Sequence, residues 1–179
     1  MTKTRKISFT VLIGAFIMLT AFTINNTLWQ IKDGYSIKFE GTDAKGEFEK
    51  INGSIIFDAE NLATSNMNIN VDVTSIATGN WLKNRHAKSE KWFDADKFPK
   101  INFTSSKFSK SANGYIVDGT LEMHGIKKQI TIPFTFDNNI FKGNFNVNRI
   151  DYGVGTLEGM SKKVSNEIKL ELSVPVVKK

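Results

Sequence analysis

Regular alternation of apolar and polar residues is the feature of this sequence that most restricts its fold. In Asn66–Val73, which reads NMNINVDV, every second residue is apolar and the residues between are asparagine or aspartate. The segments Ile130–Phe136, Phe141–Asn148 and Glu167–Val174 show the same period of two. This period places alternate side chains on opposite faces of a β-strand, with one face buried and the other in water. Strands of this kind indicate antiparallel pairing, because parallel sheets are covered on both faces.

Four further segments carry the pattern more weakly and bring the expected number of strands to about eight. They are Trp29–Phe39, Gly46–Phe57, Ile101–Phe108 and Tyr115–Met123. A bend is expected at Asp33-Gly34 within the first of them. Pro133 lies inside a strong strand pattern and has no N–H for the ladder, so we expect a sheet edge or a bulge beside it.

One segment between the third and fourth strands departs from the strand pattern. Asn80–Phe98 has residues at helical spacing, which predicts one or two amphipathic helices that Pro99 ends. The residues at this spacing are Trp81, Leu82, Arg85, Ser89, Trp92 and Phe93. The sequence therefore predicts one all-β domain, an eight-stranded antiparallel barrel with a helical insertion between strands 3 and 4. An eight-stranded barrel is just wide enough to be filled by side chains or to hold one small ligand.

The first 23 residues are expected to be a signal peptide. Lys3, Arg5 and Lys6 precede an apolar run, Ile7–Phe22, and no acidic residue interrupts them. This order is typical of secretory signals, and it predicts a periplasmic or secreted protein. The alternative is an uncleaved N-terminal anchor, because about 17 apolar residues can just span a bilayer.

Composition excludes several classes of function. The chain has no cysteine, so it has no disulfide and no thiolate site. Its 24 basic and 18 acidic residues give a charge of +6, which falls to +3 without the three basic residues of the signal segment. The remaining lysines are spread along the chain, so a nucleic-acid partner is not expected. Fourteen phenylalanines require a large apolar core or cavity wall, and the pattern alone does not choose between them.

Several short motifs follow one another in the order found in one protein family. They are Gly46-x-Phe48, Gly53–Asp58, Thr74–Gly79, His86–Ala95, Lys97–Phe103, Gly119–Lys128, Pro133 and Arg149–Val154. Together they resemble the YceI-like family of bacterial, mostly periplasmic, polyisoprenoid-binding proteins over residues 28–177. The resemblance implies a lipocalin-like barrel of residues 27–179 whose apolar interior holds an isoprenoid or similar lipid, without catalysis or a cofactor. Tyr35-Ser36 and Lys83–Ala87 depart from the family pattern, which leaves the head-group preference open.

The candidate ligand-binding residues follow from the inward faces of the expected strands. Barrel-lining candidates are Phe39, Phe48, Phe57, Ile69, Val71, Phe103, Phe134, Phe136, Phe145 and Val147. Candidates for the mouth and the head group are Tyr35, Ser36, His86, Trp92, Phe93, Arg149 and Asp151. The competing interpretation is that the aromatic residues simply pack against one another in a dry core. Arg149 and Asp151 have a second interpretation of their own, a salt bridge that closes one end of the barrel.

Other functions remain alternatives at this stage. A filled barrel would make the protein a structural or interaction module. For the lipid-binding protein we expect a monomer or homodimer with transient membrane contact, and an isoprenoid or fatty lipid as its partner. A hydrolase would use Ser36 or Ser89 with His86 and Asp94, although no G-x-S-x-G nucleophile elbow occurs. No metal site is expected, because the two histidines, His86 and His124, lie far apart in sequence and have no cysteine partner.

Overall fold

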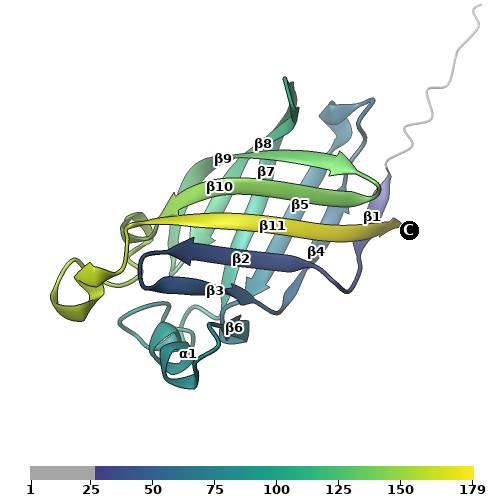
Figure 1. The fold of residues 1–179 in the computed structure, drawn as a ribbon. Helices are drawn as coiled ribbons and strands as arrows, with labels where there is room; N and C mark the ends of the chain where they lie inside the picture. The colour runs from purple at the N-terminus through teal and green to yellow at the C-terminus, as the bar shows by residue number, and fades with distance from the viewer. Residues whose placement is uncertain (1–26) are drawn as a thin grey trace, which may run out of the picture.

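The structure of the chain is a computed structural model that describes residues 27–179, so the expected signal peptide, residues 1–23, lies outside it. Figure 1 shows a twisted antiparallel sheet that curls into a barrel, with one short helix, α1 (Trp81–Lys88), beside one end. The strands are β1 (Leu28–Ile31), β2 (Ser36–Gly41), β3 (Ala44–Phe48), β4 (Ile51–Ile56), β5 (Asn66–Asp72), β6 (Ile76–Ala77), β7 (Lys100–Ser111), β8 (Gly114–Met123), β9 (Ile126–Asp137), β10 (Ile140–Asn148) and β11 (Glu167–Lys178). Four short 3-10 turns connect them, at Leu62–Thr64, Val73–Ser75, Arg149–Tyr152 and Gly159–Lys163.

The barrel closes through β1, which pairs with β4 on one side and with β11 on the other. The closed ring runs β1-β4-β5-β7-β8-β9-β10-β11, and all its pairings are antiparallel. β2 continues from β1 along the same edge of β11, and β3 continues into β4, so each pair is one interrupted strand. Gly34, with a φ of 87°, lies at the first interruption, where the sequence predicts a bend. The predicted eight-stranded antiparallel barrel is therefore confirmed.

Pro133 marks the place where two neighbouring strands of the barrel separate. β9 and β10 pair only from Asp137↔Ile140 to Phe134↔Gly143, although β9 begins at Ile126. The ladder stops beside Pro133, which has no N–H to continue it. The expectation of a sheet edge at this proline is confirmed, and the rest of β9 is paired on its β8 side only.

The helical insertion is shorter and more polar than the sequence predicts. Only Trp81–Lys88 is α-helical, none of its residues is buried, and residues 89–98 form a series of tight turns. Asn80 begins the helix by accepting hydrogen bonds from the N–H groups of Leu82 and Lys83. At the other end the main chain of Ser89 is extended, and Asp94 adopts a φ of 46°. The predicted helical insertion is confirmed, but its helix ends at Lys88 and does not continue to Phe98, because these turns reverse the chain.

The closed end of the barrel is filled by an aromatic cluster, the aromatic plug. Its members are Trp29, Phe57, Phe108, Tyr115, Phe134, Phe136 and Phe141. Phe57 is 1% exposed at the centre, and its ring centroid lies 5.1–6.1 Å from those of five other rings. Trp29 donates a hydrogen bond from Nε1 to the carbonyl of Phe57 at 2.9 Å. Among residues 27–179, no helix is long and apolar enough to cross a membrane.

Candidate functional site

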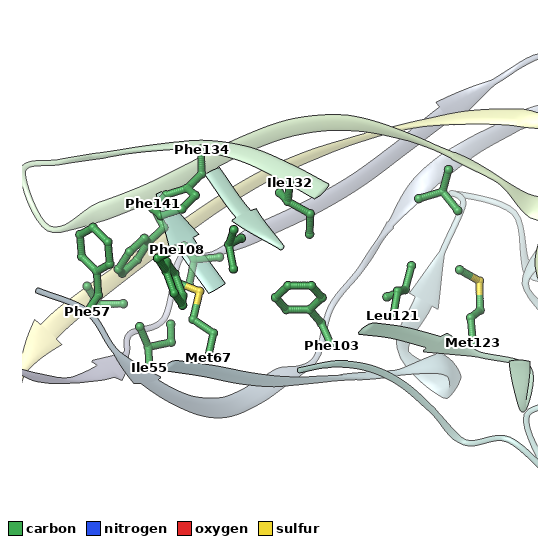
Figure 2. Close-up of a cluster of buried hydrophobic side chains, with 14 of the residues drawn as sticks. Ile55, Phe57, Met67, Phe103, Phe108, Leu121, Met123, Ile132, Phe134 and Phe141 are labelled. Atoms are coloured by element: carbon green, nitrogen blue, oxygen red, sulfur yellow. The ribbon is translucent and has the colours of Figure 1, made fainter. Parts of the chain in front are cut away.

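Above the aromatic plug the barrel encloses a cavity of about 600 Å³. Figure 2 shows Phe57, Phe108, Phe134 and Phe141 gathered together, with Leu121 and Met123 farther along the barrel. Alternate residues of β11 illustrate how period-two strands build the wall. Ile168, Leu170, Leu172 and Val174 all line the cavity. The wall is therefore almost wholly apolar at the depth of the strands, a surface that favours an apolar guest over water.

Eight of the ten expected lining residues line this cavity. They are Phe39, Phe48, Ile69, Val71, Phe103, Phe134, Phe145 and Val147. The other two, Phe57 and Phe136, lie in the aromatic plug and are not part of the cavity wall. They point inward as the alternation predicts, but they lie beyond the cavity floor formed by Phe134 and Phe141, which is a correction to the expected site.

The mouth of the cavity lies at the end opposite the plug and is built from three segments. These are α1 with the turns that follow it, the turn between β2 and β3, and the loop 153–166 between β10 and β11. His86, Trp92, Phe93 and Arg149, four of the expected mouth residues, line the cavity here. Charged side chains of either sign line the mouth at Asp43, Lys45, Lys83, Lys91 and Arg149, and Lys142 lines the cavity from β10, beside Phe141. Basic groups thus outnumber acidic ones around the cavity by five to one.

Arg149 organises the loop 153–166 from inside. It is 4% exposed, and its guanidinium donates to the carbonyls of Val154 at 2.8 Å, Ser161 at 3.0 Å and Ser165 at 3.0 Å. The guanidinium carbon also lies 5.3 Å from the ring centroid of Trp92. Burial lowers the pKa of Arg149 from its ordinary value, although the group stays cationic at any physiological pH. With Nε and both terminal nitrogens engaged, Arg149 serves as a structural brace of the mouth.

Gly155 explains how this brace packs so closely. Its φ is +72°, and a Cβ there would lie 2.7 Å from Nη1 of Arg149 and 2.8 Å from the Trp92 ring. Only glycine satisfies both the left-handed backbone and the contact. The loop 153–166 and the turn carrying Trp92 are therefore fixed to each other through one guanidinium.

Three other expected mouth residues do not line the cavity. Asp151 is exposed and pairs with Lys128, with 3.6 Å between Nζ and Oδ2, so the expected Arg149–Asp151 salt bridge is wrong. The two side chains diverge because Arg149 turns into the molecule while Asp151 follows the surface of the 3-10 turn. Tyr35 donates a hydrogen bond to the carbonyl of Glu49 at 2.9 Å. Ser36 pairs with Ser173 in the β2–β11 ladder, outside the cavity.

Within residues 27–179, no hydrogen bond joins the side chains of Ser89, His86 and Asp94, which were considered for hydrolysis. The hydroxyl of Ser89 donates to the main-chain carbonyl of His86 at 2.7 Å and caps the end of α1. Asp94 lies in a left-handed turn, and its hydrogen bonds are main-chain bonds to Lys97, Phe98 and Ser89. Within residues 27–179 no group of three or more histidine, cysteine, aspartate or glutamate side chains is arranged to hold a metal ion.

Sequence reasoning missed much of the cavity wall on β8 and β11. Val117, Leu121 and Met123 line it from β8, as do the four β11 residues named above. The sequence signal for these residues was present, because they show the same alternation of apolar and polar residues as the barrel-lining candidates named from the sequence. The lysines of the mouth could not be found in this way, since Lys83 lies on α1, Lys91 lies in the turn after it, and Lys45 lies near the start of β3.

Comparison with known proteins settles the family. The profile of the YceI-like domain matches residues 22–176. This chain belongs to the YceI-like family. A UPF0312 protein of Yersinia enterocolitica is 30% identical over 143 residues, covering 74% of this chain and 73% of that protein. A UPF0312 protein of Vibrio campbellii is 37% identical over 93 residues, about half of each chain.

Several solved structures share the fold. BcnA of Burkholderia cenocepacia superposes with a TM-score of 0.74 at 26% identity, covering 80% of this chain and 96% of that one. The YceI protein of Campylobacter jejuni gives 0.63 at 23% identity, covering 75% and 84%. A polyisoprenoid-binding domain from Saccharophagus degradans gives 0.61 at 12% identity, covering 84% and 98%. At these identities the last two comparisons support the fold alone.

Proposed function

We propose that this YceI-like barrel binds one long-chain isoprenoid or similar amphipathic lipid, without chemistry, in the bacterial envelope. The observation that carries the proposal is the cavity of about 600 Å³, apolar along the strands and closed at one end by the aromatic plug. Each methylene transferred from water to such a wall gains about 0.8 kcal/mol. The likeness in fold to the polyisoprenoid-binding domain of Saccharophagus degradans agrees with this ligand class.

We infer the orientation of the ligand from the two ends of the cavity. The floor is formed by the rings of Phe134 and Phe141, so the apolar tail enters first and ends there. The mouth brings Lys45, Lys83, His86 and Lys91 to the wall, which favours an anionic or hydrogen-bond-accepting head group. Carriage, storage or stress-related sequestration are the roles that such binding would serve after export.

The test is native mass spectrometry of the protein purified from the producing cell, followed by extraction and identification of any bound lipid. A stoichiometric lipid adduct is the expected result. A mass without lipid, unchanged after incubation with a prenyl lipid, would contradict the proposal and favour the filled-barrel alternative.

A single substitution makes this test specific to the cavity. Gly143 lines the cavity, and an added Cβ would meet only ordinary contacts, at 3.5 Å from the Pro133 carbonyl oxygen and beyond. Gly143→Phe should therefore fill the cavity without backbone strain and lower lipid affinity by at least roughly tenfold, while the melting temperature holds or rises. Asn144→Phe is the matched control, because it adds the same ring to the exposed neighbouring position on β10. Equal lipid retention in the two variants would contradict cavity binding.

A further inference from the structure

The exposed apolar side chains of this protein gather at one end of the barrel, around the mouth. The large exposed hydrophobic residues at this end are Trp81, Leu82, Ile126, Leu157 and Met160, whose exposed fractions run from 39% to 73%. Figure 1 places α1 and the loop before β11 at this end, opposite the C-terminus. Among the described residues only Val177, at the closed end, is a comparably exposed large hydrophobic side chain. We name the five residues at the mouth the apolar rim.

The apolar rim is continuous with the cavity. Met160 is 71% exposed and also lines the cavity wall. On α1, Lys83 and His86 line the cavity while Trp81 and Leu82, one turn away or less, face solvent. A guest that leaves the cavity through the mouth therefore meets the rim.

Positive charge is concentrated at the same end. The segments 42–45, 80–98, 124–128 and 149–165 carry eleven basic and six acidic residues, whereas the rest of residues 27–179 carries ten and twelve. The acids at this end are Asp43, Glu90, Asp94, Asp96, Asp151 and Glu158. One of them, Asp151, is already paired with Lys128. The net charge of the mouth end is thus +5, and that of the remainder is −2.

We propose that the apolar rim docks the mouth of the barrel on an anionic lipid bilayer. Tryptophan, leucine and methionine side chains insert at the boundary of head groups and acyl chains, and lysines near the surface are attracted by anionic head groups. The rim combines both features around the opening through which a lipid would pass. That a docked barrel exchanges lipid with the bilayer through its mouth rests on the proposed function. The docking itself rests on the exposure of the apolar rim and on the positive charge around it.

The experiment measures binding of the purified protein to vesicles of phosphatidylcholine with and without 30% phosphatidylglycerol, by flotation. Wild-type protein should bind the anionic vesicles at least roughly tenfold more tightly, and less so at high salt. Leu82→Glu with Leu157→Glu should weaken this binding at least about tenfold. Val177→Glu, which puts the same charge on the exposed position at the closed end, should leave it unchanged.

A second pair of variants measures the contribution of the positive charge at the mouth to vesicle binding, separately from that of the apolar side chains. Lys162→Gln with Lys163→Gln removes two lysines beside Met160, and the expected loss is on the order of tenfold or more in 30% phosphatidylglycerol. Lys107→Gln with Lys110→Gln removes two exposed lysines of β7 and is the matched control. Equal losses in both pairs would overturn docking by the mouth. Circular dichroism and the melting temperature verify that every variant is folded.

The orientation of the bound protein has its own readout. Quenching by brominated phosphatidylglycerol should be strong for Trp81, measured as the difference between wild type and Trp81→Phe. Trp29 lies at the closed end, so quenching of Trp29 in its place would mean that the other end meets the bilayer and would overturn the proposal. Residues 1–26 contain no tryptophan, so any binding through that segment does not imitate the Trp81 signal.

The outcomes separate this proposal from lipid binding in the cavity. A protein that carries lipid but ignores anionic vesicles retains the proposed function and overturns docking. A protein that carries and takes up no lipid, but shows the Trp81 signal, overturns the proposed function and retains docking.

Discussion

At the scale of single residues, Arg149 is the clearest case in which the same side chain suits two very different roles. From the sequence it fits a head-group ligand or a partner of Asp151. In the folded barrel its guanidinium donates to main-chain carbonyls of the loop 153–166, and it lies against Trp92. The sequence could not reveal this, because the acceptors are backbone oxygens and carry no sequence signature.

We expect Arg149→Met to lower the free energy of unfolding by about 3 kcal/mol, because it leaves several buried carbonyl oxygens without a donor. Asp151→Ala should cost less than about 1 kcal/mol, since its ion pair with Lys128 is exposed to solvent. Urea unfolding of both variants measures the difference. Similar losses for the two would restore the salt-bridge interpretation that the structure contradicts.

A β-bulge in β7 explains why the inward position of Phe108 was harder to predict from the alternation. Phe103 and Ser105 point inward from β7, but a bulge between Ser105 and Lys107 shifts the register, so Phe108 is also buried. A bulge adds one residue to one strand and reverses which residues face the core. Alternation therefore predicts the face of a residue only within an uninterrupted ladder.

At the scale of elements, the strands and the presence of a helical insertion were predictable, but the extent of the helix was not. Strand periodicity survives because the inward residues of each strand lie in the core or line the cavity, as on β10 and β11. The insertion packs through Trp92 and Phe93, which follow α1 in a tight turn, so the helical spacing holds only for the residues up to Lys88. Burial of that segment depends on tertiary contacts with Arg149 and Phe48, which no local pattern contains.

The aromatic plug is the element-scale feature with the sharpest energetic consequence. Phe57→Ala should destabilise the barrel by about 4 kcal/mol, because it removes the ring at the centre of the cluster and leaves a cavity there. Phe39→Ala removes a ring from the cavity wall near the mouth and should cost less stability but reduce lipid binding. Denaturant unfolding and lipid extraction on both variants check the assignment. A Phe39 variant that loses as much stability as Phe57→Ala would indicate a continuous core.

At the scale of the whole molecule, the sequence predicts the closed barrel but not how far its interior is filled. Every inward residue of an eight-stranded barrel follows the same alternation, whether it belongs to the plug or to the cavity. Depth along the axis depends on strand length and register, and these place Phe57 and Phe136 below the floor while Phe145 stays in the wall. The phenylalanines therefore form both a packed core and a cavity wall, the core at the closed end of the barrel and the cavity toward the mouth.

This division sets the last prediction, which concerns the stability of the loaded protein. A lipid bound only to the folded barrel stabilises it by about 2.7 kcal/mol when free lipid is a hundredfold above its Kd. For a domain of this size that corresponds to about 5–10 °C in Tm. Calorimetry of delipidated and lipid-saturated protein should show this shift, and Gly143→Phe, whose cavity is filled, should show little of it. An equal shift in Gly143→Phe would mean that the lipid acts on the outer surface, because the cavity is then not where the binding energy arises.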